Sequence, residues 1–283
     1  MPPARVFLLT VIAMIAFAGN SLLCRLALKN TNIDPASFTT IRLLSGALIL
    51  FLIVGIQRKK VTGAGNWLSA FALFIYAAGF SFAYLQLSAA TGALLLFSAV
   101  QASMLGYGFW SGERLQIIQI TGIVLALIGL LILLLPGVSA PSLSNSLLMI
   151  SAGIAWGIYS LRGKKASDAT LATTGNFLRA SVFAIVLSVI MLEYKSLDTA
   201  GIGYAICSGA LTSGIGYAIW YAVLPSLKAV TAATVQLSVP VVTAMGAIVL
   251  LDEAISLRIV LASVTILGGI ALVILQKNTK ASL

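Results

Sequence analysis

Long stretches without any charged residue limit most strongly how this chain can fold. They cover residues 6–24, 61–112, 115–161, 199–227, 229–251 and 259–276. A helix needs about 20 apolar residues to cross the hydrocarbon core of a bilayer, so the two longest stretches have room for two helices each. Only helices and closed barrels satisfy their backbone in lipid, and these runs lack the alternation of barrel strands. The sequence therefore predicts an all-α integral membrane protein.

The composition leads to the same class. Apolar residues make up 60% of the chain and charged residues 8%, whereas a soluble domain is about 45–50% apolar and about 25% charged. So few charges cannot cover a water-facing surface. The net charge of +10 comes from Lys and Arg clustered between apolar runs, as in juxtamembrane loops. We therefore predict the lipid bilayer as a partner, and no nucleic acid.

Nothing in the sequence indicates an enzyme. Cys24 and Cys207 lie within apolar runs without disulfide or metal-site spacing, and His is absent. No nucleophile–base pair stands out. We predict no catalytic residue, no metal and no cofactor. The apolar run after Arg5 is longer than the h-region of a signal peptide, so we expect an uncleaved first helix.

Ten membrane-spanning helices are predicted. Their ranges are 3–28, 35–57, 66–87, 91–111, 115–135, 144–161, 169–192, 199–224, 229–251 and 257–276. Most loop Lys and Arg residues fall on one side if both termini are cytoplasmic, as the positive-inside rule requires. Five helices per half is an odd number, so the second half enters the membrane from the opposite side. We expect two inverted five-helix repeats, residues 1–137 and 142–280.

The two halves echo each other in sequence. Residues 91–115 and 231–255 both start with Thr and small residues, continue as an apolar run and end near an acidic residue. Gln101 interrupts the first run and Pro240 the second. A second echo pairs 16–25 with 155–164, in which Phe17 corresponds to Trp156. These echoes predict that one five-helix unit is present twice.

The chain resembles the drug/metabolite transporter superfamily in its ten-helix EamA-like branch. The residues that carry the resemblance are Trp156-Gly157, Phe17-Ala18, Arg42, Arg179, Gly112-Glu113, Pro240 and Asp252-Glu253. Gln101 departs from the family pattern, which has Pro in this helix. Within the branch the chain is most similar to bacterial amino-acid exporters, including the aromatic type. The resemblance implies a multi-pass transporter of the bacterial inner (plasma) membrane that exports a small molecule.

Alternating access needs a binding site near the middle of the membrane, lined by polar groups and by aromatic rings. The candidate substrate-binding residues are Asn20, Ser21, Tyr76, Phe80, Tyr84, Ser98, Gln101, Trp156, Tyr159, Ser213, Tyr217 and Gln236. Ser residues in lipid also hydrogen-bond to their own helix, and aromatic residues also anchor helix ends. The spans 115–135 and 257–276 carry few polar residues, so we expect them at the periphery.

Charged residues offer two further hypotheses. Arg42 and Arg179 lie about 10–13 Å into their spans at a rise of 1.5 Å per residue. Each either reaches back to the near interface or flanks the cavity and attracts a carboxylate.

The acidic residues also have two interpretations. Glu113, Asp252 and Glu253 either cap the following helices or form gates. In the gate hypothesis Glu113 pairs with Lys164 or Arg162 inside, and Asp252 or Glu253 pairs with Arg25 outside.

Together these observations predict an exporter of amino acids or similar amphipathic metabolites that works by alternating access through a central cavity. The alternatives are export of another metabolite or drug class and, less well supported, a membrane scaffold. Glycines of the span 199–224, among them Gly209, are expected to allow bending or close packing. The energy coupling and any protein partner are left open, and a monomer is compatible with the sequence.

Overall fold

The structure, a computed structural model, describes residues 1–58, 61, 63–110, 116–135, 140–163, 166, 168–227 and 235–276. Within these ranges the chain is helical and contains no strand. The longer helices are α1 (Pro3–Asn30), α2 (Pro35–Ile56), α3 (Trp67–Ala83), α4 (Ala89–Trp110), α5 (Ile117–Leu134), α6 (Leu143–Gly163), α7 (Ala169–Ile190), α8 (Thr199–Cys207), α9 (Gly216–Val223), α11 (Ser238–Leu251) and α12 (Leu257–Gln276).

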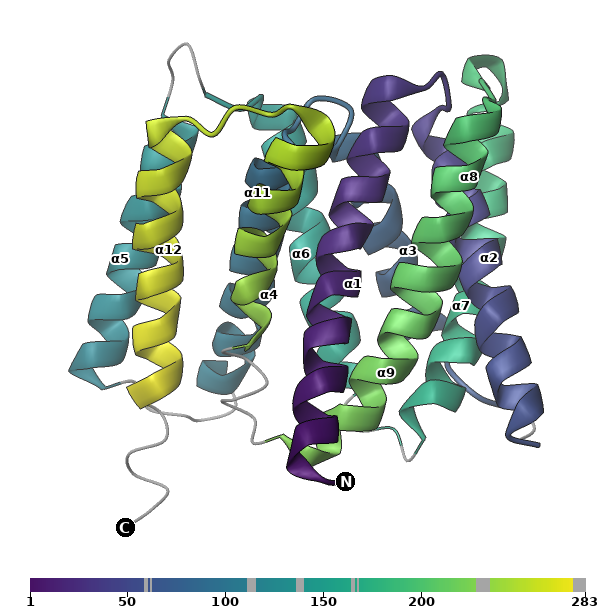
Figure 1. Ribbon diagram of the computed structural model, residues 1–283, viewed down its shortest axis with the longest axis horizontal. Helices are drawn as coiled ribbons and strands as arrows, with labels where there is room; N and C mark the ends of the chain where they lie inside the picture. Colours follow the sequence, from purple (N-terminus) through teal and green to yellow (C-terminus); the bar gives the residue numbers. More distant parts are fainter. Residues whose placement is uncertain are drawn as a thin grey trace.

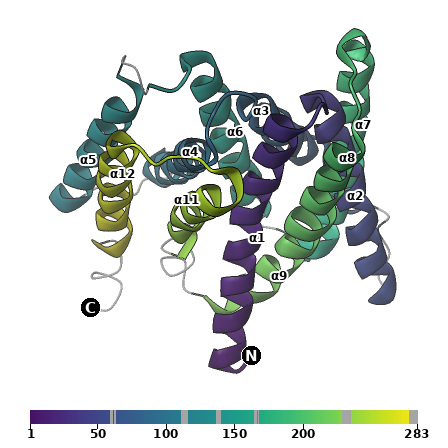
Figure 2. The ribbon, with the colours of Figure 1, turned by 45° about the horizontal axis from the view of Figure 1, so that its top comes forward.

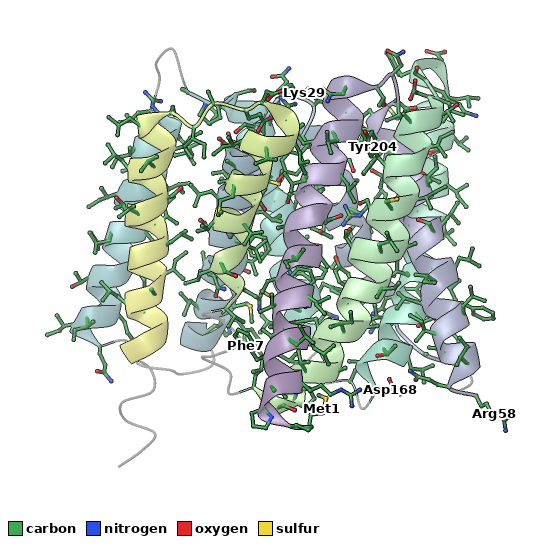
Figure 3. All side chains as sticks on the ribbon, viewed as in Figure 1. Met1, Phe7, Lys29, Arg58, Asp168 and Tyr204 are labelled. Carbon is green, nitrogen blue, oxygen red and sulfur yellow. The ribbon has the colours of Figure 1, made fainter. Side chains whose placement is uncertain are left out.

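Six helical segments of the described ranges are long and apolar enough to cross a membrane. They are Pro3–Asn30, Pro35–Ile56, Ala89–Tyr107, Ile117–Leu134, Ala169–Ile190 and Thr199–Ser226. Large apolar side chains such as Leu131 and Val189 remain more than 60% exposed, as expected where lipid is the solvent. Lys29 lies at one end of the bundle, and Arg58 and Asp168 lie at the other (Figure 3). The chain is therefore a multi-pass membrane protein.

Polar caps explain where several helices begin. Asp34 accepts a hydrogen bond from the backbone nitrogen of Ser37 at 2.8 Å, and Pro35 follows it as the first residue of α2. Asn66 caps α3 and Asp168 caps α7 in the same way. A side-chain oxygen at this position satisfies one of the first free N–H groups of a helix. The predicted starts at residues 35 and 169 are confirmed.

The helices form a bundle in which α5 and α12 stand apart as a pair. They pack mainly on each other, and α12 reaches the remaining helices through α4. Both views show this pair at one end of the molecule (Figure 1, Figure 2). The expectation that these two spans are peripheral is confirmed. The other long helices surround the centre of the larger part of the bundle.

The span predicted at 199–224 is not one regular α-helix. Its middle is a π-helix, η2 (Ser208–Ile215), between α8 and α9, and the short η3 (Leu224–Ser226) follows. A π segment is wider than an α-helix and is frequent at functional sites. It turns Ser208, Thr212 and Ser213 into the bundle, where all three are buried. Sequence periodicity does not reveal such a change of winding.

Of the last two predicted spans, one matches its helix in the structure and the other differs in where it begins. Helix α12 has the predicted range of 257–276. Helix α11 begins at Ser238 instead of residue 229, after a short helical turn at 235–236. Residues 228–234 lie outside the described ranges. Pro240 is at the third position of α11, where its missing N–H leaves no helical hydrogen bond unmade.

The first prediction concerns the close approach of η2 to α2. A Cβ atom on Gly209 would overlap the carbonyl oxygen of Arg42 and the hydroxyl of Ser45. Overpacking of this kind costs about 1–3 kcal/mol. We expect Gly209→Ala to lower the melting temperature of the purified protein by several degrees in a thermal unfolding assay. Gly203→Ala on the same span is the control, since its Cβ would meet nothing within 4 Å. Equal melting temperatures would contradict the assignment of Gly209 to close packing.

Candidate functional site

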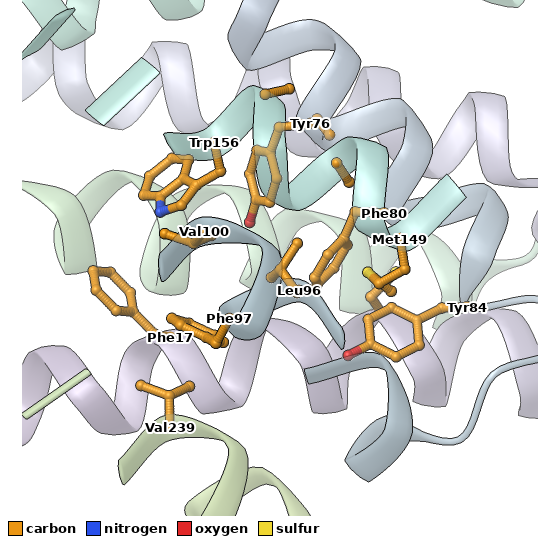
Figure 4. Packing of buried hydrophobic residues seen from close by; sticks show 14 of the residues in the cluster. Phe17, Tyr76, Phe80, Tyr84, Leu96, Phe97, Val100, Met149, Trp156 and Val239 are labelled. Carbon is orange, nitrogen blue, oxygen red and sulfur yellow. The ribbon is translucent and has the colours of Figure 1, made fainter. Parts of the chain in front are cut away.

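A small cavity of about 20 Å³ lies between the helices of the larger part of the bundle. Its lining residues are Phe17, Asn20, Ser21, Tyr76, Phe80, Leu96, Phe97, Trp156 and Tyr217. They come from α1, α3, α4, α6 and α9, so helices far apart in the sequence meet at this point. Figure 4 shows Phe17, Tyr76, Phe97 and Trp156 among the buried side chains of this region. This volume holds about one water molecule. The surrounding side chains therefore leave no room for a larger ligand in this conformation. We call it the central pocket.

Aromatic rings make up most of the wall of the central pocket. The ring of Trp156 lies 4.8 Å from that of Tyr76 and 4.9 Å from that of Tyr217, measured between centroids. Phe17 meets Tyr217 edge-on at 5.8 Å. These distances are typical of favourable aromatic pairs. The rings present both faces and edges to the cavity, so they suit the flat or apolar part of a ligand, or a cation over a ring face.

Arg42 supplies a buried positive charge directly beside this wall. Its side chain is 1% exposed. Its guanidinium lies 5.1 Å from the Tyr76 ring centre and 5.0 Å from that of Phe80. Nη2 donates to the Tyr76 hydroxyl at 2.9 Å, and Nε donates to Ser213 Oγ at 3.3 Å. No Asp or Glu of the described ranges forms an ion pair with it.

A polar network extends from Arg42 across the centre of the bundle. The Tyr76 hydroxyl also accepts a hydrogen bond from Asn20 Nδ2 at 3.1 Å. Asn20 Oδ1 in turn accepts from Ser208 Oγ at 2.7 Å and from Thr212 Oγ1 at 3.4 Å. The π segment η2 thus provides the hydroxyls that orient Asn20. The network links helices α1, α2, α3 and η2 at the level of the central pocket.

Two buried polar atoms of this region are not hydrogen-bonded within the described structure. They are Arg42 Nη1 and Ser21 Oγ. A buried donor without a partner costs about 1–3 kcal/mol, and more when it is charged. Such groups are rare in folded proteins, so each one requires a physical explanation. Arg42 carries a positive charge, and hydrogen bonds between a charged donor and an anionic acceptor are stronger than neutral ones.

Other predicted residues are placed away from the central pocket. Tyr84 donates to the Ala89 carbonyl at 3.3 Å in the turn before α4. Tyr159 stacks on Trp156 at 5.4 Å and donates to Thr173. Ser213 does not line the cavity. It is connected to the cavity wall through its hydrogen bond with Arg42.

The predicted residues Ser98, Gln101 and Gln236 also lie outside the pocket lining. Ser98 donates to its own helix at Leu94 and faces a groove on the outside of α4. Gln101 is buried, and its amide nitrogen is not hydrogen-bonded within the described part of the chain. Gln236 belongs to the helical turn before α11. Sequence spacing could not assign these faces, since α4 is buried on most of its circumference.

Arg179 does not mirror Arg42 in space. Its Nη1 donates to the carbonyl of Gly175, one turn back along α7, at 2.9 Å, and to that of Ala64 in the loop before α3. Its guanidinium also lies 5.8 Å from the Trp67 ring. Arg179 therefore reaches back towards the interface, which is one of the two expected arrangements. Arg42 instead lies buried beside the central pocket, with Tyr76 and Ser213 as its hydrogen-bond partners.

An ion pair closes one end of the bundle. Arg25 Nε lies 3.0 Å from Glu253 Oε1, and Arg25 Nη1 donates to the carbonyls of Tyr84 and Leu85. Glu253 Oε2 accepts from the backbone nitrogen of Ala89 at 2.7 Å, so this carboxylate caps α4. The pair thereby joins α1, the end of α3, the start of α4 and the loop after α11.

The expectation that Asp252 and Glu253 cap the following helix is wrong. Ser256 takes that position at α12 and accepts from the nitrogen of Ile259. Asp252 ends α11 in a left-handed conformation with φ of 50°. The residues between the two helices direct Glu253 back over the bundle.

At the opposite end of the bundle an arginine binds uncharged side chains instead of an acidic residue. Arg162, at the end of α6, donates to Ser69 at 2.9 Å and to Asn66 at 3.1 Å. Asn66 Oδ1 also accepts from the backbone nitrogen of Ser69, and the backbone nitrogen of Asn66 donates to Asn176 Oδ1 on α7. The predicted gate residues Glu113 and Lys164 lie outside the described ranges.

The central pocket also contains residues that were not predicted for it: Phe17, Leu96 and Phe97. The repeat carries a signal for the first, because Phe17 corresponds to Trp156 in the other half. Leu96 and Phe97 stand within a continuous apolar run, where nothing distinguishes a pocket-facing residue from a lipid-facing one. Ser208, which donates to Asn20, was likewise missed.

These features define a helical membrane protein with a closed polar and aromatic pocket at its centre. A family model described as the EamA-like transporter family matches residues 4–135 and again residues 143–275. The chain belongs to the EamA-like transporter family of the drug/metabolite transporter superfamily.

Several known proteins are similar to this chain. An uncharacterized protein of Pseudomonas aeruginosa is 52% identical over 283 residues, which cover 100% of this chain and 99% of that protein. The uncharacterized transporter YoaV of Bacillus subtilis is 24% identical and covers 84% of this chain, with 87% of its own length. A crystal structure aligns over 96% of this chain and 97% of its own, with a TM-score of 0.69 and 16% identity. The last similarity shows a shared fold.

The second prediction tests the ion pair by a double-mutant cycle. We expect Arg25→Gln and Glu253→Gln each to lower thermal stability, and the double variant to lose less than the sum. Contacting residues couple by about 0.5–3 kcal/mol. The control cycle combines Arg25→Gln with Glu193→Gln and should be additive, because Glu193 is an exposed residue of η1 (Leu192–Tyr194). Additivity in both cycles would show that the pair contributes nothing to stability.

Proposed function

We propose that this chain exports amino acids, or similar small amphipathic metabolites with a carboxylate, across a bacterial inner membrane. The substrate binds in the central pocket and is released by alternating access. The observation that carries the proposal is the buried guanidinium of Arg42, which lies beside an aromatic pocket and has a free donor and no acidic partner among the described residues.

The chemistry of the pocket suits the three parts of an amino acid. A carboxylate is the natural acceptor for Arg42 Nη1, and charge-assisted hydrogen bonds of this kind are the stronger ones. An ammonium group finds the faces of Trp156 and Tyr217, since cations bind to aromatic rings within about 6 Å. An apolar side chain finds Phe17 and Phe97. Ser21 Oγ is available to either polar group.

The small volume of the pocket fits a closed state of a transport cycle. With room for about one water molecule, the pocket admits a substrate only after the surrounding helices separate. Arg25 and Glu253 close one end, and Arg162 ties α6 to α3 at the other. In the proposed cycle these two closures open in turn. Arg25 and Glu253 then form the outer gate, and Arg42 is the residue that attracts the substrate.

The proposed topology has ten spans in two inverted repeats, with both termini cytoplasmic. Two observations support it. Helix α1 begins at the lower edge of the bundle and α6 begins at the upper edge (Figure 1). The helix pairings are also reciprocal: α3 packs on α6 as α1 packs on α8 and α9, and α4 packs on α6 as α11 packs on α1. A two-fold axis in the membrane plane produces such reciprocity.

The third prediction is the transport activity itself. We expect purified protein in liposomes to carry at least one labelled amino acid of a panel that includes the aromatic ones, faster than protein-free liposomes. Flux is measured with the substrate loaded inside and outside in separate experiments. If no amino acid of the panel is carried, the assigned substrate class is wrong. A carboxylate-free metabolite or drug carried in its place would establish the alternative class.

The fourth prediction separates the role of Arg42 from its role in folding. The wild-type protein should prefer an amino acid over its amide by about tenfold or more, since a hydrogen bond to a charged group contributes about 1.5–3 kcal/mol. We expect Arg42→Gln to remove most of this preference in competition assays, and Arg42→Lys to retain part of it. Arg179→Gln is the matched control and should keep the preference. An unchanged preference in a folded Arg42→Gln protein contradicts the carboxylate site.

A further inference from the structure

A groove of about 600 Å³ separates the α5–α12 pair from the rest of the bundle. Its walls come from α4, α5, α6 and α12, and they include Leu95, Ala102, Gly106, Leu127, Ile154 and Ile270. Except for Ser98 and Ser103, every lining residue is apolar or glycine. Both hydroxyls are bound to their own helix, at Leu94 and Val100. The wall therefore offers no free hydrogen-bonding side chain.

The rim of the groove continues directly into the surface that faces lipid. Leu127 on one wall is 55% exposed and Ile154 on the other is 44% exposed. Both belong to helices whose outer faces are apolar, and α5 is among the segments that can cross a membrane. The groove therefore opens sideways into the hydrocarbon core. Whatever fills it comes from the bilayer.

The chemistry of the walls excludes two other occupants. Ordered water requires two to four polar partners, and these walls provide none. A helix with its side chains is about 10–12 Å across, so one turn fills on the order of 500 Å³. The groove has room for about one such turn, whereas a spanning helix of a second copy must extend through the whole bilayer. A flexible alkyl chain is the occupant that fits both the shape and the surface.

We propose that the groove binds one acyl chain of a membrane phospholipid. The chain lies between α4 and α6 on one side and α5 and α12 on the other, with its methylenes against the lining residues. Helix α4 then has two functional faces, because Leu96 and Phe97 line the central pocket while Ala102 and Gly106 line the groove. This site is independent of the identity of the transported substrate.

Gly106 provides a way to block the site without disturbing the helix packing. A Cβ atom there would meet nothing within 4 Å, so Gly106→Phe places a ring in the groove. Gly268 on α12 has the same open surroundings and is exposed, yet it does not line the groove. Gly268→Phe is therefore the matched control, with the same residue added to a lipid-facing surface.

The fifth prediction uses these two variants in bilayers that contain a phospholipid with a photoactivatable group on its acyl chain. After irradiation, mass spectrometry of peptides locates the adducts. We expect adducts at groove residues of α4 and α6 in the wild-type protein and in Gly268→Phe. In Gly106→Phe these adducts should fall about tenfold, which corresponds to the loss of contact for two methylenes.

Three outcomes would overturn the proposal. The first is labelling spread evenly over the lipid-facing surface, without enrichment in the groove. The second is groove labelling that survives Gly106→Phe in a folded protein, as judged by an unchanged melting temperature. The third is protection of the groove in the wild-type protein together with cross-links between copies, which would assign the groove to a second copy of the chain.

Discussion

The buried guanidinium of Arg42 is the interaction on which the centre of this bundle depends. A charge in the middle of a membrane costs at least about 2.5–3.5 kcal/mol, and it stays buried only where other groups compensate it. The rings of Tyr76 and Phe80 and the hydroxyls of Tyr76 and Ser213 provide that compensation. These groups come from α3 and η2, so both elements must approach α2 closely. The charge thus determines which helices meet at the pocket.

The π segment makes this approach possible. Within η2, Ser208 and Thr212 donate to Asn20 while Ser213 accepts from Arg42. One segment therefore supplies polar partners to both α1 and α2. Gly209 removes the side chain that would otherwise hold η2 away from α2. The same eight residues of η2 therefore provide hydrogen-bond partners for Asn20 and Arg42 and allow close packing against α2.

The sequence predicts those features that depend only on the order of residues along the chain, such as the positions and starts of helices. Uninterrupted apolar runs locate α5 and α12, and the Asp34–Pro35 pair marks a helix start. Asn20 was predicted because lipid tolerates such a polar group poorly, and Tyr76 and Trp156 were predicted as aromatic rings that hold the apolar part of a ligand. The sequence does not predict which face of a helix points towards the pocket. Ser21 and Ser98 both lie within apolar runs, yet Ser21 lines the central pocket and Ser98 lines the outer groove. Only the packing of neighbouring helices distinguishes them.

The two halves show how a repeated unit can yield a single charged site. Arg42 and Arg179 occupy corresponding places on α2 and α7, but the loop before α3 presents the carbonyl of Ala64 to Arg179. At the other end of the bundle Asp34 accepts from Ser196, and the Ser196 carbonyl accepts from the nitrogen of Asp34. Arg42 lies buried and donates to the hydroxyls of Tyr76 and Ser213. The corresponding arginines of the two halves therefore have different partners, backbone carbonyls for Arg179 and side-chain hydroxyls for Arg42.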